Sequence, residues 1–204
     1  MSRSIVLFPL AATLCMPTLS QGQGPRFGIA IGKGLVAGDS RVVVDAGNFN
    51  VTGAGQSGLH IRGTAEWPLS APAFTFRAEL FYNRLYSNPN TAAVVGDSIA
   101  TAALTDRTAG LTGSFVAWLS PQAGVSPYFL FGGGVVKSSL GTNSDPQSHD
   151  VVISRGGFGL GLQTGMGLRF RVKRTDFLVE WRYAQVLNNT RGSAYWPLTV
   201  GIMF

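Results

Sequence analysis

Few residues of this chain could carry out catalysis, and their spacing is poor for it. The histidines are His60, in GLHIRG, and His149, in SDPQSHDVV. Ser148 and Asp150 flank His149, so the three residue types of a hydrolytic triad stand side by side. A nucleophile and its base must lie within hydrogen-bond reach, and immediate neighbours on one loop rarely achieve that geometry. We therefore expect no catalytic residues.

Metal and cofactor sites are equally unsupported. Two histidines far apart in the sequence do not form the ligand cluster typical of zinc. The glycine-rich FGGGVV (Phe131 to Val136) lacks the GxGxxG and GxxxxGK[ST] spacings of nucleotide-binding loops. Cys15, the single cysteine, lies in the N-terminal segment discussed below. We expect no metal, no cofactor and no thiol chemistry.

A second set of polar residues is regularly spaced and points to structure rather than to catalysis. These residues alternate with apolar ones along four segments, so that each occupies one face of an extended strand. The set comprises Arg62, Glu66, Arg77, Glu79, Gln163, Glu180 and Arg182. Opposite charges on a buried face can pair, and each must, because an uncompensated buried charge costs several kcal/mol. We predict a structural polar network inside the fold.

The elements that position these residues are strands, because the dominant period along the chain is two rather than 3.6. FTFRAELFYNRLY is the clearest case. Phe74, Phe76, Ala78, Leu80 and Tyr82 share one face, and Thr75, Arg77, Glu79 and Asn83 share the other, with Phe81 as the exception. Eight such segments run over approximately 26–36, 57–69, 74–86, 107–119, 127–137, 154–168, 176–186 and 196–204. The fifth is apolar on both faces, so its register is unreadable.

The connections between these segments alternate in length. Long polar loops are expected over 37–56, 87–106, 138–153 and 187–195, and short turns over 70–73, 120–126 and 169–175. An even number of strands with short turns on one side and long loops on the other is typical of transmembrane barrels, and segments of about ten residues suit a tilted crossing. The predicted fold is all-β: an eight-stranded antiparallel up-and-down transmembrane β-barrel.

Aromatic residues gather near both ends of the predicted strands, where rings are expected to meet lipid headgroups. Near the short turns lie Phe27, Trp67, Phe74, Tyr128, Phe170, Phe177 and Phe204. Near the long loops lie Tyr82, Tyr86, Tyr183, Tyr195 and Trp196. We therefore expect two aromatic girdles around the barrel.

The first twenty residues form a separate unit. Arg3 supplies a weak basic region, and Ile5 to Leu14 form a short apolar stretch. Small residues then allow cleavage before Gln21, as in a secretory signal peptide. We expect residues 1–20 to be a signal peptide that carries Cys15 away, and residues 21–204 to be the barrel domain.

The net charge of +6 is modest, and no run of Lys and Arg interleaved with aromatics is present. Nucleic acid is therefore not an expected partner. Charged residues make up only 13% of the chain and apolar residues 45%, which excludes disorder. Beyond the N-terminal segment no apolar run reaches eighteen residues, so the sequence also excludes a membrane-spanning helix.

The last strand, AYWPLTVGIMF, places Leu198, Val200, Ile202 and Phe204 on one face. It is expected to pair with the first strand, because a lipid-facing edge would leave backbone groups unpaired in hydrocarbon. Such a strand ending in phenylalanine resembles the signal that bacterial outer-membrane proteins present to the barrel-assembly machinery. The whole pattern resembles the small OmpA/OmpX-like barrel family. The resemblance implies a bacterial outer-membrane location and contact with outer-membrane lipid and lipopolysaccharide.

An eight-stranded barrel has an interior just wide enough for side chains to fill. The function we expect is therefore non-enzymatic, a structural or surface-interaction role with a charged, plugged lumen. A narrow porin-like channel is the first alternative. A lipid-modifying outer-membrane enzyme using His60 or His149 is another, because lipid A deacylases and palmitoyltransferases resemble this architecture. A secreted lipocalin-like barrel would instead turn its apolar faces inward. We expect the long loops to form the functional surface. Their composition does not identify a partner.

Overall fold

The structure, a computed structural model, describes residues 24–36, 42–44, 49–51, 57–86, 92–95, 98–101, 103–143, 155–188 and 191–204. The predicted signal peptide, residues 1–20, lies outside these ranges, as does His149. Within the described ranges, no helix is long and apolar enough to cross a membrane. The regular elements there are strands.

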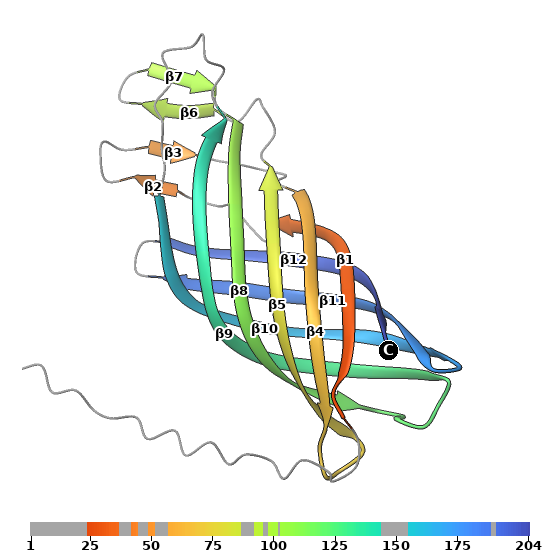
Figure 1. Cartoon of the computed structure of the whole chain (residues 1–204). Coiled ribbons are helices and arrows are strands. Elements are labelled where there is room, and N and C mark those ends of the chain that lie inside the picture. Colours follow the sequence, from red (N-terminus) through yellow and green to blue (C-terminus); the bar gives the residue numbers. More distant parts are fainter. Residues whose placement is uncertain are drawn as a thin grey trace, which may run out of the picture.

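Eight of the described strands close into a barrel in the order β1-β12-β11-β10-β9-β8-β5-β4 (Figure 1). They are β1 (Arg26–Val36), β4 (Ser57–Pro68), β5 (Phe74–Tyr86), β8 (Ala103–Trp118), β9 (Val125–Asn143), β10 (Arg155–Val172), β11 (Thr175–Asn188) and β12 (Arg191–Met203). Each strand pairs antiparallel with the next barrel strand in the chain. The predicted eight-stranded antiparallel up-and-down barrel is confirmed.

Pairing between β1 and β12 closes the sheet. The N–H of Phe27 donates to the carbonyl of Phe204 at 3.1 Å, and the N–H of Phe204 donates back at 2.9 Å. The register continues to Val36 opposite Tyr195. The two strands approach so closely that a Cβ on Gly32 would lie 1.9 Å from the Leu198 carbonyl oxygen, so only glycine fits there. The predicted pairing of the last strand with the first is confirmed.

Several connections are shorter than predicted. β9 continues to Asn143, inside the predicted loop 138–153, whereas β10 starts at Arg155, one residue after the predicted start of that strand. β11 and β12 leave only residues 189–190 between them, although the sequence predicts a loop over 187–195. These predictions were wrong because polar residues can continue backbone pairing beyond the apolar band without showing any apolar alternation.

The predicted turn over 169–175 is also too long. β10 and β11 pair as far as Val172 opposite Thr175, which leaves Lys173 and Arg174 as the turn. Lys173 has φ 57°, the left-handed conformation that tight hairpin turns use. Arg169 belongs to β10 and turns into the barrel, where it is buried. The sequence predicts this basic cluster in a turn, because charged residues are typical of loops. Arg169 instead continues the strand, because its side chain pairs with Asp176 inside the barrel.

A second, four-stranded sheet was missed by the sequence analysis. Its strands are β2 (Val42–Val44), β3 (Phe49–Val51), β6 (Ala92–Val95) and β7 (Ser98–Thr101), in that order. They arise from the predicted loops 37–56 and 87–106, and Figure 1 shows them beyond the long-loop end of the barrel. Strands of three or four residues are too short to show a period, so pattern alone could not find them.

The barrel wall separates apolar from polar side chains in the opposite sense to a soluble protein. Ile29, Leu80 and Phe131 point outward and are 63%, 67% and 67% exposed. On the same strand as Leu80, Arg77 and Glu79 point inward and are almost fully buried. This arrangement is the one expected for a wall that faces hydrocarbon. It contradicts the lipocalin-like alternative, which requires apolar faces that point inward.

The aromatic girdles are present with two exceptions. Phe27, Phe74, Phe177 and Phe204 are exposed on the outer wall near the short turns, and Tyr86 is exposed near the long loops. Tyr128 and Tyr195, in contrast, are buried inside the barrel. Tyr128 was misplaced because its strand has no readable register. Tyr195 was misplaced because its segment is strand rather than loop.

Closure of the barrel by β1 and β12 can be tested by cross-linking. Ile31 and Val200 are directly opposite and share the outer face. Their hydrogen-bonded pairing places the Cα atoms about 5.5 Å apart, within the range that a disulfide can bridge. We expect Ile31→Cys/Val200→Cys to form a disulfide in the folded barrel, measured as a mobility change on non-reducing gels.

The control pair is Ile31→Cys/Val179→Cys. Val179 is opposite Val200 on β11, so it lies two strands away from Ile31, about 10 Å. We expect no intramolecular cross-link in this variant. Equal cross-linking of the two pairs, or of neither, would contradict the closed register.

Candidate functional site in the barrel interior

Alternation along four strands brings the seven predicted polar residues into the barrel. β4 supplies Arg62 and Glu66, β5 supplies Arg77 and Glu79, β10 supplies Gln163, and β11 supplies Glu180 and Arg182. The six charged members are at most 4% exposed. They are three arginines and three glutamates, so the cluster is electrically balanced. We call these six residues the central ion cluster.

Glu180 is the hub of the central ion cluster. Its carboxylate accepts hydrogen bonds from Arg62 and Arg182, and from Nη1 of Arg77 at 2.8 Å. The hydroxyl of Tyr128 also donates to it, at 2.5 Å. Three guanidinium groups from three strands therefore converge on a single carboxylate. Any movement of β11 would disturb the ion pairs that join Glu180 to Arg62 on β4 and to Arg77 on β5.

The other two glutamates complete the pairing of the arginines. Glu79 receives Nη1 and Nη2 of Arg182 on its two oxygens at 2.5 and 2.6 Å, the fork geometry of a strong bidentate pair. Glu66 receives Nε of Arg77 at 2.9 Å. Gln163 donates to Glu79 at 3.1 Å and accepts from Arg182 at 2.9 Å. Each buried charge thus has an opposite charge beside it, as burial requires.

Two apolar clusters cover the central ion cluster from above and below. On the long-loop side the buried cluster is Phe81, Leu85, Val136, Ala184, Val186 and Tyr195. On the short-turn side it is Val116, Trp118, Tyr128, Leu130, Leu178 and Met203. The inward residues of β11 pass through these layers in order, because Leu178, Glu180, Arg182 and Ala184 alternate along the strand. The charged layer is therefore shielded from water at both ends.

Sequence reasoning missed these apolar layers. It marked Phe81 as an exception to the polar face of β5, and that exception was the available signal. The contribution of Val136 could not be read, because β9 is apolar on both faces. Tyr195 was placed on the outer girdle.

A smaller ion cluster lies at the short-turn mouth and was also missed. The buried carboxylate of Asp176 pairs with Arg26 at 2.5 Å, with Arg171 at 3.4 Å and with Arg169 at 3.8 Å. The Arg169 guanidinium also lies 3.9 Å from the centroid of the Trp118 ring. This cluster ties the start of β1 to the hairpin between β10 and β11.

Among the described residues, His60 has no partner arrangement of a catalytic kind. His60 is buried, stacks on Phe81 with ring centroids 5.9 Å apart and lies 6.4 Å from the ring of Tyr195. Its Nδ1 atom has no hydrogen-bond partner there, so no carboxylate orients that nitrogen as in a triad. The described residues hold no group of three or more His, Cys, Asp or Glu suited to a metal ion. His149 lies outside the described residues.

Three residues of the predicted assembly signal lie on β12, and the fourth, Phe204, directly follows it. Leu198, Val200 and Phe204 are 52%, 56% and 65% exposed on the outer wall, and Ile202 shares their face. Their recognition by the assembly machinery stays a prediction.

No family model matches the chain, and no curated protein matches its sequence. Among solved structures, Neisserial surface protein A is 13% identical with a TM-score of 0.55, covering 89% of this chain and 96% of that one. Ail of Yersinia pestis, in complex with the heparin analogue sucrose octasulfate, is 15% identical with a TM-score of 0.51, covering 89% and 100%. The outer membrane protein OprG of Pseudomonas aeruginosa is 12% identical with a TM-score of 0.51, covering 89% and 97%. The chain has the fold of small bacterial outer-membrane barrels.

Removing the hub carboxylate should destabilise the barrel strongly. Glu180→Gln leaves three arginines without their shared partner, and breaking a buried pair in this way costs about 3–5 kcal/mol. We expect a loss of that size in the free energy of unfolding, measured by urea titration of the barrel refolded into lipid vesicles.

The matched control is Glu66→Gln, which makes the same chemical change on a carboxylate that pairs with one arginine. Arg77 then keeps Glu180 as a partner, so the loss should be clearly smaller. Equal losses for the two variants would show that Glu180 is not the hub.

Proposed function

We propose that this chain is a non-enzymatic protein of the bacterial outer membrane, with a barrel closed to ions and a long-loop end that serves surface interactions. The observation that carries the proposal is the layered interior. A balanced ion cluster fills the cross-section, and apolar residues cover it on both sides. An ion crossing this interior would have to displace buried pairs and then pass through apolar side chains, at a high cost in desolvation.

The outer wall supports the membrane location. From Phe74 to Arg84, β5 advances by ten residues, which is about 33 Å along the strand. A tilt of about 45° turns this into about 23 Å along the membrane normal, close to the apolar band of about 25 Å in outer-membrane barrels. The outward residues between them on this strand are apolar apart from the Tyr82 hydroxyl. β5 therefore has the length and surface that the outer membrane requires.

The buried setting of His60 supports a non-enzymatic role. Phe81 and Tyr195 enclose its ring, and they belong to the apolar cluster on the long-loop side. A lipid-modifying enzyme needs its base at a surface that the lipid can reach.

We assign the surface-interaction role to the long-loop end of the barrel, where β2, β3, β6 and β7 form a separate sheet. Exposed connections on a rigid scaffold are the usual place for binding.

The closed lumen can be tested by single-channel recording. We expect the barrel, refolded into a planar bilayer, to show no steady conductance, because an ion would have to displace the buried pairs of the central ion cluster and pass the apolar layers on both sides. A heat-dependent shift in gel mobility is the control that the barrel has formed. Steady conductance from a folded barrel would support the porin-like alternative and reject the plug.

The orientation of the barrel can be tested by labelling intact cells. We expect Asn50→Cys, on β3, to react with a polymer-linked maleimide too large to cross the outer membrane. Lys173→Cys, in the opposite hairpin turn, should react only after the membrane is permeabilised. The unaltered chain controls for Cys15. Labelling of Lys173→Cys in intact cells, with Asn50→Cys protected, would reverse the proposed orientation.

A further inference from the structure

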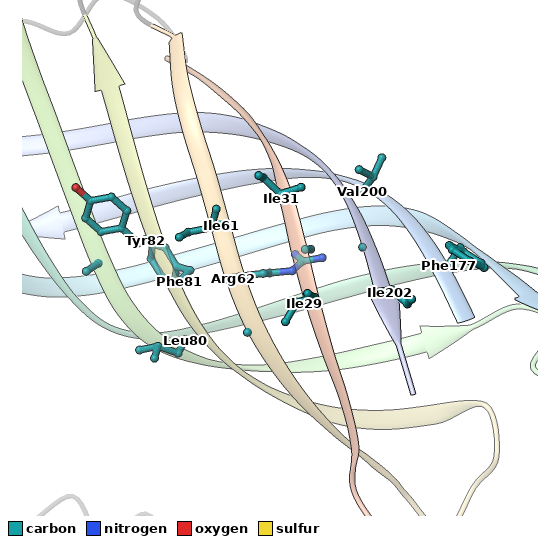
Figure 2. Close-up of a pocket in the computed structure, with 14 residues that line it drawn as sticks. Ile29, Ile31, Ile61, Arg62, Leu80, Phe81, Tyr82, Phe177, Val200 and Ile202 are labelled. Atoms are coloured by element: carbon teal, nitrogen blue, oxygen red, sulfur yellow. The ribbon is translucent and has the colours of Figure 1, made fainter. Parts of the chain in front are cut away.

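The outer wall of the barrel carries an apolar groove of about 930 Å³ that runs from β11 across β12, β1, β4 and β5 to β8 (Figure 2). Its outward-facing lining consists of apolar side chains and the Tyr82 ring, and includes Ile29, Ile31, Leu80, Ala109 and Phe177. Gly63 forms part of its floor, and a Cβ built there would meet nothing within 4 Å. The groove arises because Gly63 and Ala109 are small, whereas their neighbours on the same face are large. Its shape and chemistry suit an acyl chain.

A row of basic residues borders the long-loop side of this groove. On neighbouring strands, Lys33 lies opposite Leu59, Leu59 lies opposite Arg84, and Arg84 lies opposite Arg107. This row is the next outward row beyond Ile31, Ile61, Tyr82 and Ala109, which line the groove. Three cations therefore stand along one edge of the apolar groove. We call Lys33, Arg84 and Arg107 the basic row.

The basic row has no counter-charge among the described residues. None of the ion pairs between described residues includes Lys33, Arg84 or Arg107. Arg84 and Arg107 are directly opposite on neighbouring strands, and like charges in that position destabilise a sheet. The Arg84 guanidinium lies 4.8 Å from the centroid of the Tyr86 ring, and its buried Nε has no hydrogen-bond partner within the described part of the chain. An external anion would relieve this repulsion.

The acidic side chains that the structure describes lie on the other side of the wall. In the ranges whose side chains the structure describes, the carboxylates are Glu66, Glu79, Asp106, Asp176 and Glu180, and each is buried inside. The charges on the outer face in these ranges are thus of one sign. Hydrocarbon alone would not stabilise the three positive charges of the basic row beside an apolar groove.

We propose that the groove and the basic row together bind a phosphorylated, acylated lipid of the outer leaflet. An acyl chain lies in the groove over Gly63, and a phosphate group receives the guanidinium groups of Arg84 and Arg107, which suit bidentate phosphate binding. Lys33 supplies a third positive charge at the edge of the groove. This inference rests on the proposed membrane location and orientation, and it names a partner of the outer wall rather than of the loops.

The test uses the full barrel in detergent micelles and titrates it with lipid A, followed by native mass spectrometry. We expect Arg84→Gln/Arg107→Gln to weaken lipid A binding by about tenfold or more. The matched control is Lys173→Gln/Arg174→Gln, which removes the same charge from the opposite end of the barrel and should leave binding unchanged. A heat-dependent gel shift verifies that each variant is folded.

A second variant tests the groove without changing any charge. Gly63→Leu places a side chain in open space on the outer wall, so the barrel should fold normally while the acyl chain loses its place. We expect lipid A binding to weaken in this variant as well. Unchanged binding in Gly63→Leu would overturn the groove as the acyl site.

Two further ligands identify the source of the phosphate. Dephosphorylated lipid A and inorganic phosphate should each bind at least about tenfold more weakly than lipid A, because each offers only half of the contacts. Inorganic phosphate binding as tightly as lipid A would overturn a lipid site, and so would equal binding of the dephosphorylated lipid. A folded, non-conducting and correctly oriented barrel that shows no preference for lipid A would overturn this inference alone and leave the proposed function standing.

Discussion

A strand in hydrocarbon has no water to satisfy its backbone, so each N–H and C=O must find a partner on a neighbouring strand. In this chain the requirement is met by the pairing of β1 with β12, sealed by the reciprocal hydrogen bonds between Phe27 and Phe204. Closure removes both edges of the sheet. It also divides each strand into one face toward the lipid and one toward the lumen, and every other feature of the barrel follows from that division.

The lumen face has too little room for water and too many charges to be left unpaired. The charges form a balanced layer in which Glu180 pairs with three arginines, and Arg182 donates from Nη1 and Nη2 to the two carboxylate oxygens of Glu79. Apolar layers above and below isolate these pairs from bulk water. A buried pair in such surroundings is costly to break, so these lumen residues also hold β4, β5 and β11 in one relative register.

The lipid face is a consequence of the same segregation. With the carboxylates of the described barrel residues turned inward, the cations that remain outside have no internal partner. Three of them, Lys33, Arg84 and Arg107, lie along one row at the edge of an apolar groove that the small residues Gly63 and Ala109 leave open. The charges of the central ion cluster are therefore paired with one another, whereas the basic row on the outside is complementary to an anion from the membrane.

Local alternation determined much of this protein. It predicted β1 and β5 with their observed bounds, the pairing of the last strand with the first, and the set of seven polar residues that lies in the lumen. Alternation is a property of neighbouring residues, so it survives in the sequence alone. Only the tertiary structure decided which lumen residues meet, because Arg182 and Glu79 are 103 residues apart and the stagger between strands sets their heights. The register between β5 and β8 likewise placed Arg84 opposite Arg107. A period of two contains no information on stagger, and that is the physical reason for the division.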